Sequence, residues 1–403
     1  MIKAKKDKIS ELEFIALMAF LMSIVALSID GILPGLSDIG VALNRTNNND
    51  LQGIITMIFL GLGIGQLFFG TLSDSLGRKP VVYAGVITFC AASFIAVNAT
   101  SLEMMLVARL LQGIGLSAPR SVSISIIRDL YKGDNMARIM SFITVIFILV
   151  PMIAPFLGQL ILNAYNWKAI FYFQMIVTII TVIWFALRQR ETVTDENRLK
   201  LSKFLFIDGV KEFFKFRETV VYTIVSGFMT GSFMVYLSVS KQIFQDQYGL
   251  VSEFVYIFGG ISFFLGFATF INGSIVMRFG MKKIATISMY IFTFSAFFYT
   301  VLFFSSGNPG IYVLIGFIAI QFLCIGFIFG NVRALAMEPI GHIAGVGASL
   351  NGFISTMMAV PLAVFIGHFI DNTALPLFIG FMFCGLLSIL CIYLLDNFKI
   401  DNT

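Results

Sequence analysis

The sequence predicts an all-α integral membrane protein with twelve transmembrane helices arranged as two six-helix halves. Of the 403 residues, 58% are hydrophobic and only 12% are charged, whereas ordinary soluble domains carry about 25% charged residues. So much apolar surface has to face lipid, because a soluble core of this size could not hide it. At about 20 residues per span, a chain of this length accommodates roughly twelve helices with their loops.

Short polar segments separate the expected spans. The spans cover residues 14–33, 51–72, 81–97, 102–127, 139–162, 169–187, 220–239, 254–277, 284–304, 311–331, 344–366 and 375–395. With the N-terminus in the cytoplasm, 22 of the 27 Lys and Arg residues fall in cytoplasmic segments and 3 in outer loops. Basic residues are retained on the cytoplasmic side, so we expect both termini there. The first apolar run leads into further spans and does not have the form of a cleavable signal.

A polar turn between the second and third spans recurs in the second half of the chain. Residues 70–79 read Gly-Thr-Leu-Ser-Asp-Ser-Leu-Gly-Arg-Lys, and residues 273–283 repeat this frame 203 residues later, with Met277 in the place of Asp74. The repeat predicts two related halves that flank the longest charged linker. The expected parts are an N-terminal half at 1–187, a cytoplasmic linker at 188–219 with an amphipathic helix around 203–216, and a C-terminal half at 220–403.

The turn at 70–79 resembles the G-x-L-x-D-x-x-G-R-K/R loop signature of the major facilitator superfamily. The fixed positions are filled by Gly70, Leu72, Asp74, Gly77, Arg78 and Lys79. The resemblance implies two six-helix halves related by an axis along the membrane normal, with the substrate site between them. It also implies a gate in which Asp74 docks on the helix N-terminus of span eleven, near residues 341–347, and Arg78 pairs with Asp129.

Three charged residues, Asp30, Arg109 and Arg120, lie inside expected spans. A charge at the membrane centre costs about 2.5–3.5 kcal/mol on insertion scales and is functional by default. Asp30 lies in the outer part of span one, about 24 Å from residue 14. An acid that faces a gated cavity can exchange a proton in each transport cycle. The alternative is an ordinary water-exposed carboxylate at the membrane interface.

The surroundings of Asp30 resemble one branch of the superfamily. Residues 28–34, Ser-Ile-Asp-Gly-Ile-Leu-Pro, are similar to the D-x-x-L-P segment of bicyclomycin-resistance-like drug:proton antiporters. Relatives that export cationic drugs carry a further acid two turns earlier, where this chain has Met22. Residues 166–171 and 337–350 resemble further segments of the same branch. The resemblance therefore covers both halves.

Span four carries two arginines on one helix face. Arg109 and Gln112 belong to Arg-Leu-Leu-Gln-Gly-Ile-Gly, which is similar to the R-x-x-Q-G-x-G signature of the family. Arg109 either acts on the cavity acid or only clamps neighbouring helices. Arg120 lies eleven residues on, about 20° around the helix. It is either a cavity cation for an anionic or zwitterionic substrate or a side chain that snorkels to the interface.

Span five contains Pro151, Pro155 and Gly158, a partial match to the Gly-Pro-rich helix of proton antiporters in this superfamily. Prolines remove backbone donors and permit bending, which suits a helix along the boundary between the halves. The alternative is that the two prolines are simply tolerated in a membrane helix.

Nothing in the sequence indicates a cofactor or a metal. The four cysteines lie in apolar runs without C-x-x-C spacing, the two histidines are isolated, and no phosphate-binding G-x-x-x-x-G-K-S/T is present. The basic charge indicates membrane topology and no nucleic-acid partner.

We therefore expect a non-enzymatic transporter of a bacterial inner membrane. It would be a monomer that exports a small amphipathic compound in exchange for protons by alternating access, with the bilayer as its surroundings. An alternative substrate is an endogenous metabolite such as a siderophore or an amino acid. A membrane sensor or an intramembrane enzyme is the alternative from a different class.

Overall fold

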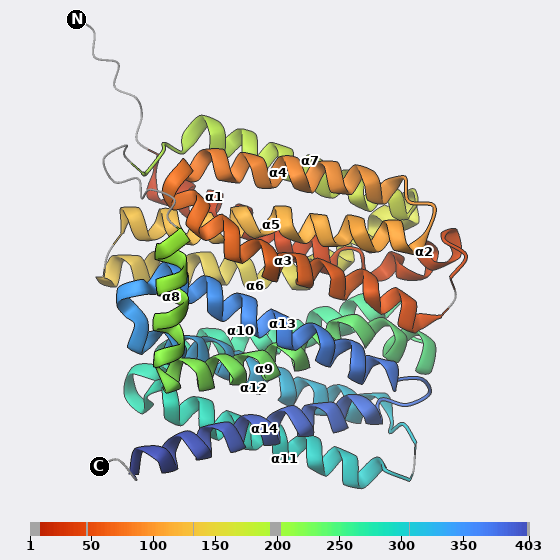
Figure 1. Cartoon of the computed structure of the whole chain (residues 1–403). Coiled ribbons are helices and arrows are strands. Elements are labelled where there is room, and N and C mark those ends of the chain that lie inside the picture. The colour runs from red at the N-terminus through yellow and green to blue at the C-terminus, as the bar shows by residue number, and fades with distance from the viewer. Residues whose placement is uncertain (1–8, 46, 132, 194–202, 306, 401–403) are drawn as a thin grey trace, which may run out of the picture.

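The fold is a bundle of long helices (Figure 1), seen in a computed structural model that describes residues 9–45, 47–131, 133–193, 203–305 and 307–400. No β-strand occurs in these residues. Six long helices precede the linker: α1 (Glu11–Asp30), α3 (Asn48–Leu76), α4 (Arg78–Val97), α5 (Leu102–Leu130), α6 (Gly133–Ala164) and α7 (Trp167–Arg188). Six follow it: α9 (Arg217–Lys241), α10 (Phe254–Phe279), α11 (Met281–Phe303), α12 (Ile311–Met337), α13 (Ala344–His368) and α14 (Leu375–Ile400).

The all-α membrane fold predicted from the sequence is confirmed. Within the described residues, eleven helices are long and apolar enough to cross a membrane. The remaining long helix, α6, has 32 residues and includes the apolar stretch Leu149–Ala164. Figure 1 shows α1 and α3–α7 as one layer of the bundle and α9–α14 as a second layer beside it.

Polar caps set where several of these helices begin. The side chains of Ser10, Ser101 and Asn166 precede α1, α5 and α7, and each accepts a hydrogen bond of 3.2 Å from a backbone N–H in the first turn. Such caps satisfy donors that the helix leaves unpaired. They fix the starts of helices whose interiors are too uniformly apolar to define their own ends.

The expectation of a polar turn over residues 70–79 is corrected by the structure, because most of this segment is helical. Helix α3 continues to Leu76 and α4 begins at Arg78, so Gly77 alone separates them. Gly280 separates α10 from α11 in the same way. The two glycines have φ of +99° and +80°, values that a side chain with a Cβ rarely adopts. A sharp reversal at a single glycine therefore replaces the longer polar loop that the composition suggested.

Close contact between the layers occurs along α3 and α13. A Cβ added at Gly63 would lie 2.8 Å from the side chain of Thr356, and one added at Gly70 would lie 2.8 Å from the hydroxyl of Ser349. Small residues permit such approach of membrane helices. The boundary between the two layers, called the seam below, is therefore tight on this side.

Helix α8 (Lys203–Lys215) lies where the sequence predicts a helix in the linker. Figure 1 shows it crossing one end of both layers, the end at which α14 finishes. Phe213 is fully buried in a small cluster with Val346 and Leu350 of α13, and a Cβ at Gly209 would meet Val346 at 2.8 Å. The helix thus packs on the protein through its apolar face. The short helices η1 (Leu33–Gly35), α2 (Leu36–Ala42), η3 (Gln242–Gln247) and η4 (Glu338–Ile343) complete the fold.

Candidate functional site

The junction of α3 and α4 holds a network of charged side chains, called the junction network below. Arg78 is 3% exposed. Its Nε and Nη2 donate to the two carboxylate oxygens of Asp129 at 3.0 and 3.2 Å, and Nη1 donates to Asp74 and Ser73. Bidentate arginine–carboxylate pairs of this kind are strong and directional. The network ties the ends of α3, α4 and α5 together.

Glu191 and Lys79 extend the junction network and join α4 to α7. The carboxylate of Glu191 accepts the backbone N–H groups of Arg78 and Lys79, each at 2.9 Å. In return, Lys79 Nζ donates to the carbonyl oxygens of Ala186 and Gln189, both at 2.9 Å. An acid therefore caps the N-terminus of α4 and a cation caps the C-terminus of α7, which is the arrangement that helix dipoles favour.

The sequence reasoning missed Glu191. It lies in the linker among many other charged residues, and nothing in its neighbourhood separates it from them. The Arg78–Asp129 pairing that the family resemblance implies is present. The docking of Asp74 on the N-terminus of α13 stays a prediction, since the contact described for its carboxylate is the one with Arg78.

Arg109 of α5 is fully buried. Its Nε donates to the carbonyl oxygen of Ile54 at 2.9 Å, its Nη1 and Nη2 donate to that of Ser28 at 3.2 and 3.1 Å, and Nη1 also reaches Gln112 at 2.9 Å. Gln112 Nε2 donates in turn to Ser93 Oγ at 2.7 Å. The two residues therefore connect α1, α3, α4 and α5 as a helix clamp.

Asp30 is the last residue of α1, and its side chain is only 4% exposed. The alternative of a water-exposed interfacial carboxylate does not hold in this structure. Its Oδ1 has no hydrogen-bond partner among the described residues. The clamp formed by Arg109 reaches the carbonyl oxygen of Ser28, two residues earlier. The arginine thus positions the backbone that carries Asp30, and no direct bond between the two side chains is described.

The helix that carries Asp30 breaks at the next residue and meets α6 there. A Cβ added at Gly158 would lie 2.0 Å from the carbonyl oxygen of Gly31, which leaves room for glycine only. Pro155 lies one turn earlier on the same helix, and Pro151 one turn before that. Gly259 of α10 approaches α6 near these prolines, because its added Cβ would lie 3.2 Å from the carbonyl oxygen of Met152. Helix α6 therefore packs against the segment after Asp30 within its own layer and against α10 across the seam.

An aromatic cluster lies in the second layer around Tyr236 of α9, which is fully buried. The charge of Asp30 acts electrostatically on Tyr236 across the seam. Its ring stacks on Phe258 at 5.9 Å and meets Phe322 edge-on at 4.5 Å between centroids. The hydroxyl of Tyr236 has no hydrogen-bond partner in the described part of the chain. Each side of the seam thus carries a buried polar group without a hydrogen-bond partner among the described residues, Asp30 Oδ1 on one side and the Tyr236 hydroxyl on the other.

Two arginines lie on opposite sides of the seam nearer the end that carries α8. Arg120 of α5 is partly exposed and Arg333 of α12 is exposed, and their charges interact. Neither makes an ion pair or a hydrogen bond to a residue that the structure describes. The guanidinium of Arg333 lies 5.5 Å from the ring centre of Phe329. The structure separates Arg120 from the buried clamp at Arg109, although helix periodicity puts both on one face.

The other end of the bundle is joined across the seam by hydrogen bonds. Gln52 Nε2 of α3 donates to Gln242 Oε1 at 3.2 Å and to the carbonyl oxygen of Gly367 at 3.3 Å. Lys241 Nζ donates to Ser37 Oγ of α2. The sequence analysis counted Lys241 only among the basic residues of the outer loops and did not single out Gln52 or Gln242, since uncharged amides near span ends carry no distinctive signal.

Comparisons with known proteins agree with this architecture. A family model described as Major Facilitator Superfamily matches residues 15–363. An uncharacterized MFS-type transporter, YdgK of Bacillus subtilis, is 29% identical over 373 residues, 89% of this chain and 90% of that protein. A bicyclomycin resistance protein homolog of Haemophilus influenzae is 26% identical over 396 residues, 95% of this chain and 96% of that protein.

Further matches include the multidrug resistance protein MdtL of Shewanella oneidensis, 26% identical over 370 residues, which are 89% of each chain. Among solved structures, a D-xylose-proton symporter superposes with a TM-score of 0.74 at 14% identity, covering 94% of this chain and 97% of that one. At such low identity, the structural likeness supports the fold alone.

Proposed function

Because the chain belongs to the major facilitator superfamily, we propose that it is a proton-coupled exporter of small amphipathic compounds that works by alternating access. The family and its bacterial relatives make it a multi-pass inner-membrane transporter. The names of two matching relatives, a bicyclomycin resistance protein homolog and a multidrug resistance protein, favour efflux. We take the end that carries α8 as the cytoplasmic one, which follows the distribution of basic residues.

The observation that carries the proposal is the buried, partly unpartnered carboxylate of Asp30. A buried charge without a full set of hydrogen-bond partners is costly. Burial therefore favours the protonated, neutral form of a carboxyl group at this position. A group that takes a proton from one side of the membrane and releases it to the other can couple transport to a proton gradient. Tyr236 lies across the seam, so Asp30 would gain or lose this neighbour when the halves move.

The polar contacts fit a transporter that is closed at the outer end. The bonds of Gln52 and Lys241 join the two layers there. Opening that end requires their loss, and a gate at the cytoplasmic end would then have to close. The junction network and α13 are the elements placed to form such a gate, as the loop signature implies.

Arg120 and Arg333 favour a substrate that carries a negative or zwitterionic group. Two neighbouring cations without a carboxylate partner in the described residues repel each other, and an anion between them would relieve that repulsion. The ring of Phe329 beside Arg333 offers an apolar surface to the rest of an amphipathic molecule. This feature also fits the alternative substrate class, an endogenous metabolite such as a siderophore or an amino acid. Competition of transport by lipophilic carboxylates and by lipophilic cations would separate the two charge classes.

Proteoliposomes with an imposed pH gradient test the coupling. We expect Asp30→Asn to abolish substrate-induced proton movement and uphill export while downhill exchange persists. Asp38→Asn is the matched control, because Asp38 is an exposed acid on α2 close to the same end of the bundle. Normal coupling in Asp30→Asn would refute the assignment of the proton to this carboxylate.

A further inference from the structure

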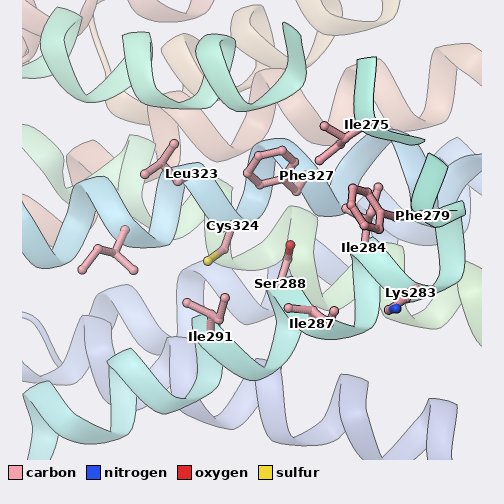
Figure 2. A pocket seen from close by; sticks show the side chains of 11 residues that line it. Ile275, Phe279, Lys283, Ile284, Ile287, Ser288, Ile291, Leu323, Cys324 and Phe327 are labelled. Carbon is pink, nitrogen blue, oxygen red and sulfur yellow. The ribbon is translucent and has the colours of Figure 1, made fainter. Parts of the chain in front are cut away.

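The second layer carries an open groove between three of its helices (Figure 2). The groove has a volume of about 440 Å³ and lies between α10, α11 and α12. Its walls are formed by apolar side chains such as Ile287, Ile291, Leu323 and Phe327. Ile287 and Ile291 are each 49% exposed. A surface of this kind suits a hydrocarbon chain, because its apolar side chains offer water no hydrogen-bond partners.

One end of the groove is positively charged. Lys283, in the first turn of α11, lines it. Arg278, in the last turn of α10, does not line the groove itself, but its guanidinium lies 5.3 Å from the ring centre of Phe279, which does. Neither side chain has a carboxylate partner within the described part of the chain, whereas the neighbouring Lys282 is paired with Asp396. The groove therefore joins an apolar channel to two cations whose charge no acid balances.

The internal repeat sharpens this contrast. In the first copy, Arg78 is buried among Asp74 and Asp129, so its charge is neutralised within the protein. In the second copy, Met277 stands in the place of Asp74 and Met281 in the place of Arg78, so this ion pair is absent there. Arg278 and Lys283 occupy the places of Ser75 and Pro80, so the second copy has two cations where the first has none. Neither has a carboxylate partner in the described residues, and their charge is available to a ligand outside the chain.

The dimensions fit a lipid that is held by its phosphate. A helix rises about 1.5 Å per residue, so Ile291 lies about 12 Å along α11 from Lys283. Between them, Ser288 is a polar residue of the lining, and Figure 2 shows its hydroxyl directed into the space between α11 and α12. No hydrogen bond of this hydroxyl is described. It lies where the ester group of a lipid would pass.

We propose that this groove binds one anionic glycerophospholipid of the surrounding bilayer. Lys283 and Arg278 hold the phosphate, Ser288 donates to an ester carbonyl, and one acyl chain runs along Ile287 and Ile291. Basic pockets between membrane helices are known to bind acidic headgroups in this way. A zwitterionic lipid has the same acyl chains, but its headgroup cation opposes the two basic side chains, so it binds more weakly.

Native mass spectrometry of the full chain in detergent tests the site. The protein is titrated with a phosphatidylglycerol and, separately, with a phosphatidylcholine of the same acyl chains. We expect one tight phosphatidylglycerol per chain. Lys283→Gln should weaken its binding about fivefold, the effect of one basic residue near an anionic headgroup. Ile287→Trp should displace the lipid by filling the groove while leaving the charges in place.

Lys211→Gln is the control, because Lys211 is an exposed lysine of α8 at the same end of the bundle. It should bind phosphatidylglycerol as the unchanged protein does. The proposal is overturned if both Lys283→Gln and Ile287→Trp keep the bound lipid, or if phosphatidylcholine binds equally well. A dimer that Ile287→Trp dissociates would assign the groove to a second copy of the chain and would overturn it as well.

Discussion

Glu191 allows a sharp test of the junction network, because one carboxylate caps α4 from the linker. Its Oε2 accepts from the N–H of Lys79, and its Oε1 accepts from those of Arg78, Thr192 and Val193. Glu191→Gln keeps the shape but replaces one oxygen by an amide that cannot accept. The variant therefore loses at least one charge-assisted hydrogen bond and the charge at the helix N-terminus.

The expected loss follows from these two contributions. A hydrogen bond to a charged group contributes about 1.5–3 kcal/mol, and a charge at a helix N-terminus adds about 0.3–1 kcal/mol. Glu191 is partly exposed, so water compensates for part of the lost hydrogen bonding. We therefore expect a loss of about 2 kcal/mol in the free energy of unfolding. The assay is reversible unfolding in mixed detergent micelles, followed by the fluorescence of Trp167 and Trp184, the two tryptophans of the chain, both in α7.

Glu253→Gln supplies the matched control. Glu253 also precedes a helix, α10, but its side chain makes no capping hydrogen bond there. Its replacement should change the free energy of unfolding by less than about 0.5 kcal/mol. If Glu191→Gln is no more destabilising than Glu253→Gln, the capping role derived from the backbone hydrogen bonds is refuted.

Four further outcomes are expected. Asp74→Asn should impair transport at near-normal expression, because the amide lacks the charge that Arg78 and a helix N-terminus would meet; wild-type rates would contradict a gate at this place. Arg109→Lys should lower the free energy of unfolding by about 2–4 kcal/mol, because an ammonium cannot reproduce the hydrogen bonds that the guanidinium makes to several helices. The measurement is an unfolding transition in detergent. Gly77→Ala and Gly280→Ala should each cost about 1–3 kcal/mol in backbone strain, and only the former should also slow transport, since its Cβ would press on Glu191. A reporter fused after Thr403 should be active only in the cytoplasm.

Much of the fold follows from composition and spacing. Uncharged runs long enough to cross a bilayer predict the spans, because lipid imposes that length. The 203-residue repeat anticipates that Gly77 and Gly280 occupy equivalent places, and the structure gives both a positive φ. Gly31 and Pro34 also mark the break after Asp30, because glycine and proline end helices. The expected first span, 14–33, lies within the apolar helical segment Glu11–Ala42.

The partners of individual side chains were harder to predict. Membrane helices are apolar on most faces, so periodicity does not distinguish the side that faces lipid from the side that faces protein. Helix spacing put Arg109 and Arg120 on one face, yet packing buries the first in a clamp and leaves the second by the seam. Glu191 and Tyr236 acquire their neighbours only when distant helices meet. The partners of these side chains depend on tertiary geometry, which the spacing of residues along one helix does not determine.

The two glycine junctions have the same backbone but very different surroundings, and this has an energetic consequence for the proposed cycle. Gly77 is enclosed by ion pairs and caps, whereas no heavy atom beyond the adjacent residues of the chain lies within 4 Å of the position that a Cβ at Gly280 would take. A duplicated architecture with equal halves would give inward- and outward-open states of similar free energy. Here the hydrogen bonds and ion pairs around Gly77 brace one hairpin, and the other lacks such an enclosure. In the proposed cycle we therefore expect the first hairpin to move as a rigid unit and the second to yield more readily, which hydrogen exchange of the two junctions would measure.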